Sequence, residues 1–114
     1  MVDDQPSFRK LAREVLHLRG YTVVGEAGCS DTAVAAALQL QPDAVLLDMR
    51  LGDESGFEVS WALSRACPDA AILLVSNQDY GHYSDRLRFC GARGFVLKSR
   101  LASVELAAYW PDPV

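Results

Sequence analysis

The chain has 114 residues, of which 50% are hydrophobic and 23% are charged, and its formal net charge is −4. This length fits one globular domain that buries a core without disulfides or a structural metal. The acidic balance argues against direct nucleic-acid binding, and no apolar run approaches the roughly 20 residues of a membrane-spanning helix. The start of the chain lacks the pattern of a signal peptide, so we expect a cytoplasmic protein without membrane contact.

The three cysteines, Cys29, Cys67 and Cys90, are an odd number and lack the spacing of metal ligands. Cysteines of this kind behave as small apolar residues in a reducing compartment. We therefore expect all three to be buried or half-buried.

Strand-like and helix-like segments alternate along the chain. Caps, glycines and prolines bound the helical patterns, while short apolar runs indicate strands. The expected strands are Met1–Val2 as the tail of a first strand, Tyr21–Val24, Ala44–Leu47, Ala71–Val75 and Phe95–Leu97. The expected helices run from Pro6 to Gly20, from about Ser30 to Gln41, from Phe57 to Ala66, from Tyr83 to Gly91 and, as a short final helix, from Leu101 to Trp110.

A strand–helix unit repeated five times predicts an α/β fold with a parallel sheet and right-handed crossovers. The fully apolar run Ala44–Leu47 is typical of a strand that has helices on both of its faces. In this interpretation residues 1–110 form one domain. Residues 111–114, which include Pro111 and Pro113, form a tail or the start of a linker.

Polar or ionisable side chains directly follow four of the expected strands. They are, in chain order, Asp3, Asp4, Asp48, Ser76 and Lys98. Parallel strands of an open sheet place such residues together at the edge where these folds bind ligands. Three carboxylates, a hydroxyl and an ammonium in one crevice suit a divalent cation and a phosphoryl group.

Five short motifs surround these side chains. They read Val2-Asp3-Asp4-Gln5-Pro6, Val45-Leu46-Leu47-Asp48-Met49-Arg50-Leu51, Gly56-Phe57-Glu58, Leu74-Val75-Ser76 and Gly91-Ala92-Arg93-Gly94-Phe95-Val96-Leu97-Lys98. In order and spacing they resemble the receiver (CheY-like) domain of bacterial two-component response regulators, over essentially the whole chain. The resemblance implies a flavodoxin-like, doubly wound (βα)5 sheet with strand order 2-1-3-4-5.

The resemblance also implies a metal site. Asp3 and Asp4 match the acidic pair that binds Mg²⁺, together with Asp48 and the backbone carbonyl of Arg50. The chemistry agrees, because Mg²⁺ prefers oxygen ligands and keeps several waters. Carboxylates a few ångströms apart also repel one another and are poorly tolerated without a cation.

Asp48 matches the residue that accepts a phosphoryl group from a sensor histidine kinase. Ser76 matches the hydroxyl residue and Lys98 matches the lysine that contact the phosphoryl oxygens in the family. The charge of Lys98 would offset the repulsion between the Asp48 carboxylate and the incoming phosphoryl group. Phe95 matches an aromatic residue whose rotamer responds to phosphorylation in the family. An aromatic residue that only packs in the core is an equally good interpretation of Phe95. The implied protein is a self-modifying switch and not a turnover enzyme.

Several positions depart from the family. The first strand is truncated to Met1–Val2, which we expect to reflect missing upstream residues or a destabilised domain. Glycine stands at position 52, where proline is frequent, and should loosen the loop after Asp48. Lys98 is followed by Ser99, so we expect no cis peptide there. The last helix is short, which puts the usual partner or homodimer surface in doubt.

The stretches around Val23–Ala27 and Gly91–Phe95 look most like receivers of LuxR/NarL-type transcription regulators. A DNA-binding helix-turn-helix output domain is not part of this chain, which is expected to be an excised receiver or a single-domain regulator. One alternative is a degenerate receiver that acts as a phosphorylation-independent interaction module. A Mg²⁺-dependent phosphohydrolase is less favoured, because Arg50 stands where such enzymes carry an acid, and a flavin-binding protein would need a phosphate-cradling loop.

Overall fold

The computed structural model of the protein describes residues 1–78 and 84–112. Its helices are α1 (Pro6–Leu18), α2 (Ser30–Leu40), α3 (Gly56–Ala66) and α4 (Ser84–Phe89), with two short 3-10 helices, η2 (Lys98–Arg100) and η3 (Leu106–Ala108). Its strands are β1 (Ala44–Asp48), β4 (Ala71–Ser76) and β5 (Gly94–Leu97), with a small hairpin of β2 (Arg50–Leu51) and β3 (Glu54–Ser55). The α/β class and most predicted bounds are confirmed; Tyr83, the predicted start of the fourth helix, lies outside the described residues.

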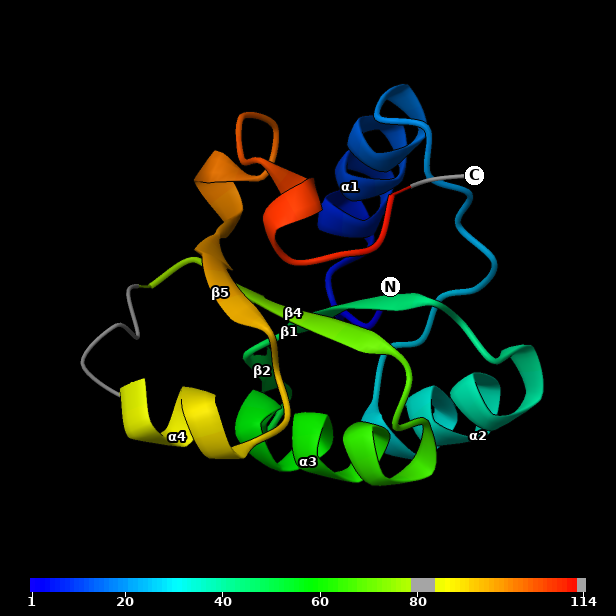
Figure 1. The fold of residues 1–114 in the computed structure, drawn as a ribbon, viewed down its shortest axis with the longest axis vertical. Coiled ribbons are helices and arrows are strands. Elements are labelled where there is room, and N and C mark those ends of the chain that lie inside the picture. Colours follow the sequence, from blue (N-terminus) through cyan, green and yellow to red (C-terminus); the bar gives the residue numbers. More distant parts are fainter. Residues whose placement is uncertain (79–83, 113–114) are drawn as a thin grey trace.

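A parallel sheet separates two layers of helices. Figure 1 shows α1 and the C-terminal segment on one face, and α2, α3 and α4 on the other. The sheet order is β1-β4-β5, and all six residues of β4 are buried. Strands covered on both faces have no solvent-facing positions, which is why β1 and β4 read as continuous apolar runs.

The last three strands pair in the predicted order, as β1-β4-β5, and the predicted places of the first two strands hold only isolated bridges of Val2. Val2 forms parallel bridges to Ala27 on one side and to Leu47 of β1 on the other. The Val2 N–H donates to Leu46 O at 2.8 Å, and the Asp48 N–H donates to Val2 O at 2.9 Å. This pairing lays the residues that follow Val2 beside the end of β1.

The predicted strand Tyr21–Val24 is wrong, because the described structure has no strand there. A strand needs a neighbour to satisfy its backbone groups, and only Met1–Asp3 is available at this edge. These residues pair with the segment around Ala27, where the Ala27 N–H donates to Met1 O at 2.9 Å. Tyr21–Val24 therefore forms no strand despite its high β-propensity, because no strand is available to pair with it.

The predicted final helix from Leu101 to Trp110 is also wrong: only η3 forms, after an extended residue at Glu105. The guanidinium of Arg19, just after α1, donates to the carbonyl oxygens of Ala102 at 2.5 Å and of Val104 at 2.8 Å. These bonds satisfy carbonyls that a continuous helix would have used itself.

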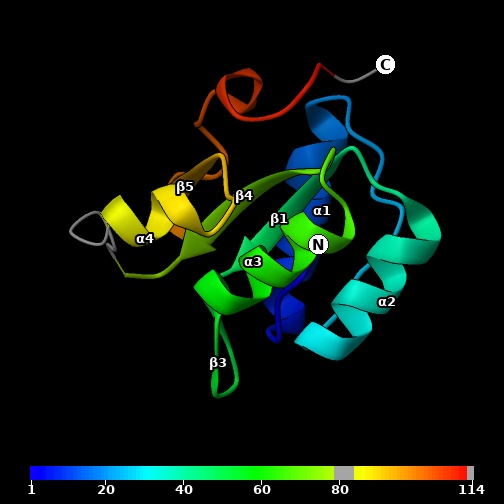
Figure 2. The ribbon, with the colours of Figure 1, turned by 60° about the horizontal axis from the view of Figure 1, so that its bottom comes forward.

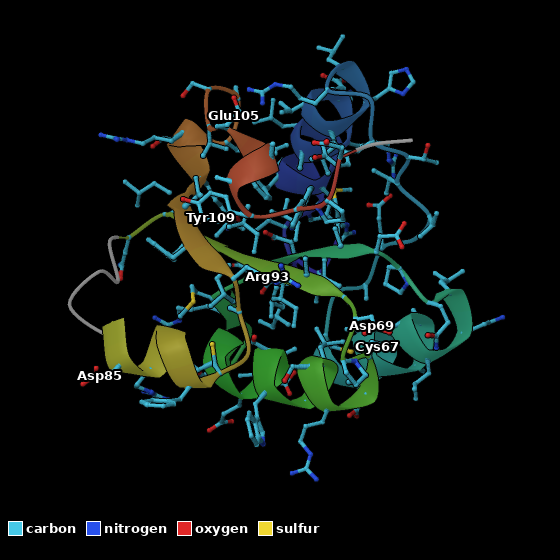
Figure 3. The ribbon with its side chains drawn as sticks, in the orientation of Figure 1. Cys67, Asp69, Asp85, Arg93, Glu105 and Tyr109 are labelled. Atoms are coloured by element: carbon cyan, nitrogen blue, oxygen red, sulfur yellow. The ribbon has the colours of Figure 1, made fainter. Side chains whose placement is uncertain are left out.

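Aromatic packing anchors the C-terminal segment that follows. Trp110 is buried and meets the Tyr21 ring edge-on, with centroids 5.3 Å apart. Tyr109, labelled in Figure 3, lies against Gly94 of β5, where any side chain larger than hydrogen would strike the tyrosine ring. Tertiary contacts thus hold this segment in place without a regular helix.

The cysteine prediction is correct for two residues and wrong for the third. Cys67, labelled in Figure 3, and Cys90 are buried, whereas Cys29 is exposed at the position before α2. Cys29 and Cys67 are free cysteines. Within the described residues there is no cis peptide bond, as expected after Lys98, and no helix is long and apolar enough to span a membrane.

Candidate functional site

Four of the five polar side chains predicted to converge line one cleft at the carboxyl ends of the strands, and the fifth, Asp3, is buried beside them. Asp48 ends β1, Ser76 ends β4 and Lys98 follows β5, and the Val2 bridge sets Asp3 and Asp4 beside them. The cleft has a volume of about 320 Å³ and is lined by Asp4, Gln5, Asp48, Arg50, Gly52, Ser76, Asn77, Gln78 and Lys98.

The three carboxylates form a tight cluster. One oxygen from each of Asp3, Asp4 and Asp48 lies within 4.8 Å of the others. Asp3 is 2% exposed and Asp48 is 6% exposed, while Asp4 is exposed on the rim. Such an arrangement concentrates negative charge where little water is available to screen it.

Lys98 is the cation that faces this cluster. Its Nζ lies 2.8 Å from Asp3 Oδ2 and 3.3 Å from Asp48 Oδ2, and donates to Gln5 Oε1 at 3.2 Å. The Nζ also lies 4.3 Å from the centre of the Phe8 ring. The lysine is only 9% exposed, so these contacts hold the ammonium inside the cleft.

Burial raises the pKa of the Asp48 carboxyl above its usual range, and the neighbouring charge of Asp3 raises it further. The Arg50 N–H, which donates to Asp48 Oδ1 at 3.2 Å, and the Lys98 ammonium oppose this shift. The fold therefore disfavours the ionised form of Asp48, the carboxylate that the sequence singles out, unless a further cation binds.

Asp4 connects the cleft to the hairpin that follows β1. Its Oδ2 accepts a hydrogen bond from the Gly52 N–H at 3.1 Å. Gly52 has a φ of +62°, a left-handed conformation that glycine adopts without strain. Figure 2 shows the hairpin projecting from the sheet near β3. Glycine at position 52 thus suits the turn geometry.

Ser76 lies beside the carboxylates with its hydroxyl partly engaged. Its Oγ accepts a hydrogen bond from the Gln78 N–H at 3.1 Å, which leaves the hydroxyl proton free to donate elsewhere. Phe95 does not line the cleft; it is half-buried within β5 and packs against the core on the α3 side of the sheet. Its register partner in β4 is Leu74, two residues before Ser76.

Sequence reasoning missed Gln5, whose side chain accepts a hydrogen bond from Lys98 and lines the cleft. The sequence signal that could have identified Gln5 as a site residue was its position directly after the acidic pair. Asn77 and Gln78 also line the cleft, and both follow Ser76. Residues adjacent to a strand-end side chain share its edge of the sheet, so neighbours of the motifs are natural further candidates.

The donor set fits a divalent cation of the Mg²⁺ type. Three carboxylates face one ammonium, so the cluster keeps a net negative charge when all the acids are ionised. Asp3 Oδ2 is buried and accepts no well-oriented hydrogen bond, although Lys98 Nζ is near it. Carboxylate oxygens without nitrogen or sulfur donors are the ligand type that hard cations prefer.

Known proteins resemble this chain in sequence and in structure. It is 35% identical to the nitrate/nitrite response regulator protein NarP of Escherichia coli, over 95% of this chain and 51% of NarP. It is 31% identical to the response regulator GacA of Pseudomonas aeruginosa, over 86% of this chain and 46% of GacA. The chain therefore spans about half the length of these relatives.

Solved structures agree with the sequence comparisons. A LuxR-family two-component response regulator from an Aurantimonas species superposes with a TM-score of 0.80 at 30% identity, covering 86% of this chain and 71% of that one. A response regulator from Burkholderia pseudomallei, with a phosphorylated aspartic acid, a calcium ion and citrate, superposes with a TM-score of 0.78 at 26% identity, covering 94% of this chain and 65% of that one.

The family model described as "Response regulator receiver domain" matches residues 1–108. This match spans every residue that lines the cleft, from Asp4 to Lys98. Together with the relatives of the LuxR/NarL type, it confirms the predicted resemblance: the chain belongs to the receiver domain family of two-component response regulators.

Proposed function

We propose that Asp48 accepts a phosphoryl group from a sensor histidine kinase and that this event switches a partner surface of the domain. The observation that carries the proposal is the cleft itself: a buried carboxylate lies among two further acids, a lysine and a serine hydroxyl. The phosphorylated aspartic acid in the Burkholderia relative supports it, because that protein has the same fold.

In the transfer step, an Asp48 oxygen attacks phosphorus and forms an acyl phosphate. The bond between phosphorus and the kinase histidine nitrogen breaks, and that nitrogen keeps the electron pair. Lys98, held 3.3 Å from Asp48 Oδ2, offsets the repulsion between the carboxylate and the incoming phosphoryl oxygens. The Ser76 hydroxyl can then donate to one of the new oxygens.

Asp3, Asp4, Asp48 and the backbone carbonyl of Arg50 would hold Mg²⁺ in this proposal. A bound Mg²⁺ supplies positive charge that neutralises oxygens of the transferring group. The raised pKa of the Asp48 carboxyl supports this assignment, since its causes are burial and the neighbouring charge of Asp3, which a further cation would offset. The calcium ion in the Burkholderia relative is a further support.

The switch in this proposal runs from Ser76 to Phe95. A hydrogen bond from Ser76 to the phosphoryl group would draw the end of β4 toward Asp48, and β5 lies directly beside β4. Phe95, opposite Leu74, would repack against its neighbours, and the surface over β5 would change. The two arrangements are states of one equilibrium that phosphorylation shifts.

The partners follow from the family. Receiver domains of response regulators are paired with histidine kinases, and several relatives are transcription regulators. We propose a cytoplasmic receiver of residues 1–110, a phosphoacceptor and not a turnover enzyme, which forms a homodimer or contacts an output domain but does not itself bind nucleic acid or membrane. Residues 111–114 would form a tail or linker.

Phosphorylation is tested with acetyl phosphate and Mg²⁺ as the donor system, read out by intact mass. One phosphate per chain is expected, and Asp48→Asn should abolish the adduct while circular dichroism shows an intact fold. Asp53→Asn, which changes an exposed acid of the hairpin loop, is the matched control and should label normally. A folded wild-type chain that takes up no phosphate would instead indicate an interaction module.

The metal role is tested in the same assay. Asp4→Ala, or removal of Mg²⁺ with a chelator, should slow labelling at least about tenfold, because the transferring oxygens lose their neutralising charge. Labelling at the wild-type rate without Mg²⁺ would contradict the assignment of Asp4 as a ligand.

A further inference from the structure

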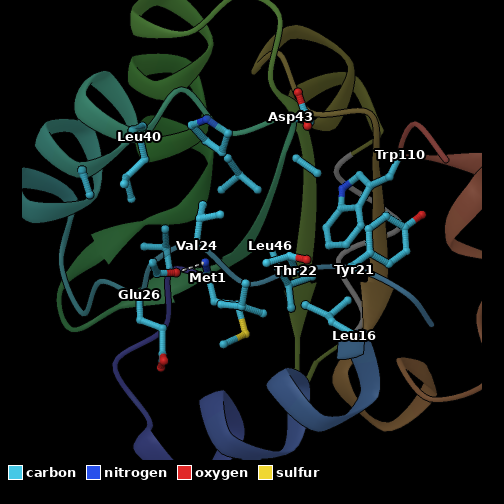
Figure 4. A pocket seen from close by; sticks show the side chains of 18 of the residues that line it. Met1, Leu16, Tyr21, Thr22, Val24, Glu26, Leu40, Asp43, Leu46 and Trp110 are labelled. Carbon is cyan, nitrogen blue, oxygen red and sulfur yellow. Dashed lines mark hydrogen bonds between the residues drawn. The ribbon is translucent and has the colours of Figure 1, made fainter. Parts of the chain in front are cut away.

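Two cavities of the described structure lie on either side of Val2, and they differ in their lining. The larger, of about 510 Å³, lies between β1 and the segment from Gly20 to Ala27, and Figure 4 shows apolar side chains such as Leu16 and Leu46 around it. This apolar cavity continues the line of Val2 between its two bridging partners, so it belongs to the sheet of the fold itself. The smaller one is the acidic cleft, where Gln5 makes contacts that have no role in the transfer step described above.

Gln5 is the N-cap residue of α1, yet its side chain does not cap the helix. A short polar side chain at this position normally accepts a hydrogen bond from an N–H of the first turn. Gln5 makes no such bond, and its Oε1 instead accepts a hydrogen bond from Lys98 Nζ at 3.2 Å. Its backbone N–H donates to Asp3 Oδ1 at 2.8 Å, which fixes the residue beside the carboxylate cluster. The rim of the cleft thus carries a neutral acceptor that is directed at the lysine.

Phe8 contacts the same ammonium from the first turn of α1. Residues three apart lie on one side of a helix, so Gln5 and Phe8 can both face Lys98. The centre of the Phe8 ring lies 4.3 Å from Lys98 Nζ, and Phe8 is buried. The face of an aromatic ring attracts a cation within about 6 Å of its centre, and more strongly where water is excluded.

The charges around Lys98 change during the proposed transfer, whereas these two contacts carry no charge. Three oxygens lie near its Nζ: Asp3 Oδ2 at 2.8 Å, Gln5 Oε1 at 3.2 Å and Asp48 Oδ2 at 3.3 Å. The Asp48 carboxylate becomes an uncharged carbonyl when one of its oxygens bonds to phosphorus, and Asp3 would share its carboxylate with Mg²⁺. Gln5 and Phe8 bind neither phosphorus nor metal in this scheme, so their attraction for the ammonium persists.

We propose that Gln5 and Phe8 form a neutral cradle that positions Lys98 and keeps its ammonium in the cleft while Asp48 takes up the phosphoryl group. This inference rests on the proposed phosphoryl transfer to Asp48. The cradle is neutral for a physical reason. A third acid in contact with Lys98 would also hold the ammonium, but its negative charge would repel the incoming phosphoryl oxygens. Gln5 and Phe8 act through Lys98 and are therefore positioning residues.

The cradle is tested first without metal or phosphate donor, by hydrogen exchange of the lysine ammonium groups. The chain has two lysines, Lys98 and the exposed Lys10, so a chain labelled with ¹⁵N-lysine contains its own reference signal. Gln5→Met keeps the shape of the side chain but removes the acceptor, and it should speed exchange at Lys98 about tenfold. Exchange at Lys10 should not change, and Gln5→Glu should exchange at Lys98 as slowly as the original chain. Equal Lys98 rates in Gln5→Met and the original chain would overturn the proposal.

The second test measures phosphate uptake from acetyl phosphate by intact mass. At saturating Mg²⁺, Gln5→Met should label about tenfold more slowly, because a misplaced ammonium stabilises the transferring oxygens less well. The Mg²⁺ concentration for half-maximal labelling should stay the same, since Gln5 is not a proposed ligand. Gln5→Glu should also label slowly, because its charge faces the donor. Gln39→Met, the same change at an exposed position of α2, is the matched control and should label normally.

Two further variants separate the positioning of Lys98 from a general effect on the fold. Phe8→Leu keeps an apolar side chain without the ring face and should slow labelling about threefold. In a Lys98→Met chain, Gln5→Met should cause no further loss, because both changes remove the same interaction. A loss from Gln5→Met that persists in the Lys98→Met chain would overturn the proposal, because Gln5 would then act through another group.

The outcomes separate the cradle from the transfer itself. An original chain that takes up no phosphate would contradict phosphoryl transfer to Asp48, and the exchange rates would still decide whether Gln5 holds Lys98. An original chain that labels, with Gln5→Met labelling at the same rate, would overturn the cradle alone. Labelling of Gln5→Glu at the original rate would show that neutrality at this position is not required, which also contradicts the proposal.

Discussion

At the scale of single residues, Asp48 combines a proposed functional role with a cost in stability. Its carboxyl group is buried beside Asp3, and these two causes raise its pKa despite the contacts from Lys98 and the Arg50 N–H. A site that is short of positive charge before a ligand arrives is common in proteins that bind cations or phosphoryl groups. The same feature makes the fold sensitive to pH.

The sign of that sensitivity follows from linkage. A carboxyl whose pKa is higher in the folded state than its ordinary value of 3.8 favours folding while it is protonated. This contribution is present below about pH 3.8 and is lost as pH rises through the raised folded-state value. Asp48→Asn, which stays neutral, should therefore unfold at a higher temperature than the original chain at pH 7 without Mg²⁺.

The difference between the two chains should shrink as the pH is lowered toward 4, when Asp48 takes up its proton. Thermal melts across this range in metal-free buffer measure it, with Asp53→Asn as the control for an exposed acid. If Asp48→Asn melts at a lower temperature than the original chain at neutral pH, the stabilisation of the carboxylate by Lys98 outweighs the cost of burying it.

At the scale of elements, the end of the chain shows how tertiary contacts replace a helix. Arg19 supplies donors to the carbonyls of Ala102 and Val104, and Trp110 packs on Tyr21. The segment from Leu101 to Tyr109 is thereby held against α1 although its only helical part is the short η3. We expect a partner at the surface near the last helix, so the order of this segment bears on the proposed switch.

Removing the Arg19 contacts should loosen this segment. Arg19→Met keeps the apolar stem and leaves two carbonyls without their donors, so we expect a loss of about 1–3 kcal/mol in the free energy of unfolding. Urea denaturation measures the loss, and hydrogen exchange should be faster for the amides of residues 103–110. Lys10→Met, at an exposed position of α1, is the matched control. An equal loss of stability in Lys10→Met would show that Arg19 acts only through its charge.

At the scale of the whole molecule, the isolated bridges of Val2 position the candidate site. The acidic cleft lies at the carboxyl ends of the strands, and the apolar cavity lies toward their beginnings. One bridging residue between Ala27 and Leu47 sets the position of both. A ligand in the acidic cleft would stabilise this pairing, because it would bind the folded chain and not the unfolded one.

Mg²⁺ should accordingly raise the melting temperature of the chain. At a metal concentration ten times Kd the gain is about 1.4 kcal/mol, and it should fall strongly in Asp4→Ala. Differential scanning calorimetry with MgCl₂, against NaCl of equal ionic strength, separates binding from screening. Equal melting temperatures in the two salts would show that the acidic cluster does not bind this cation.

The sequence by itself determined most of the alternation of strands and helices and the edge at which the candidate functional side chains meet. Apolar runs such as Ala44–Leu47 and Ala71–Val75 carry a strong local signal, because strands covered on both faces admit no polar position. Polar residues directly after such runs must then lie at one edge. This is why Asp48, Ser76 and Lys98 could be placed together without coordinates.

Only the tertiary structure decided how far the first strand pairs, why Tyr21–Val24 forms no strand and why the last helix breaks at Glu105. Each depends on partners distant in the chain, and local propensity does not contain them. The contact of Gln5 with Lys98 likewise spans 93 residues. Local patterns set which elements can form, whereas the available hydrogen-bond partners set which of them do form.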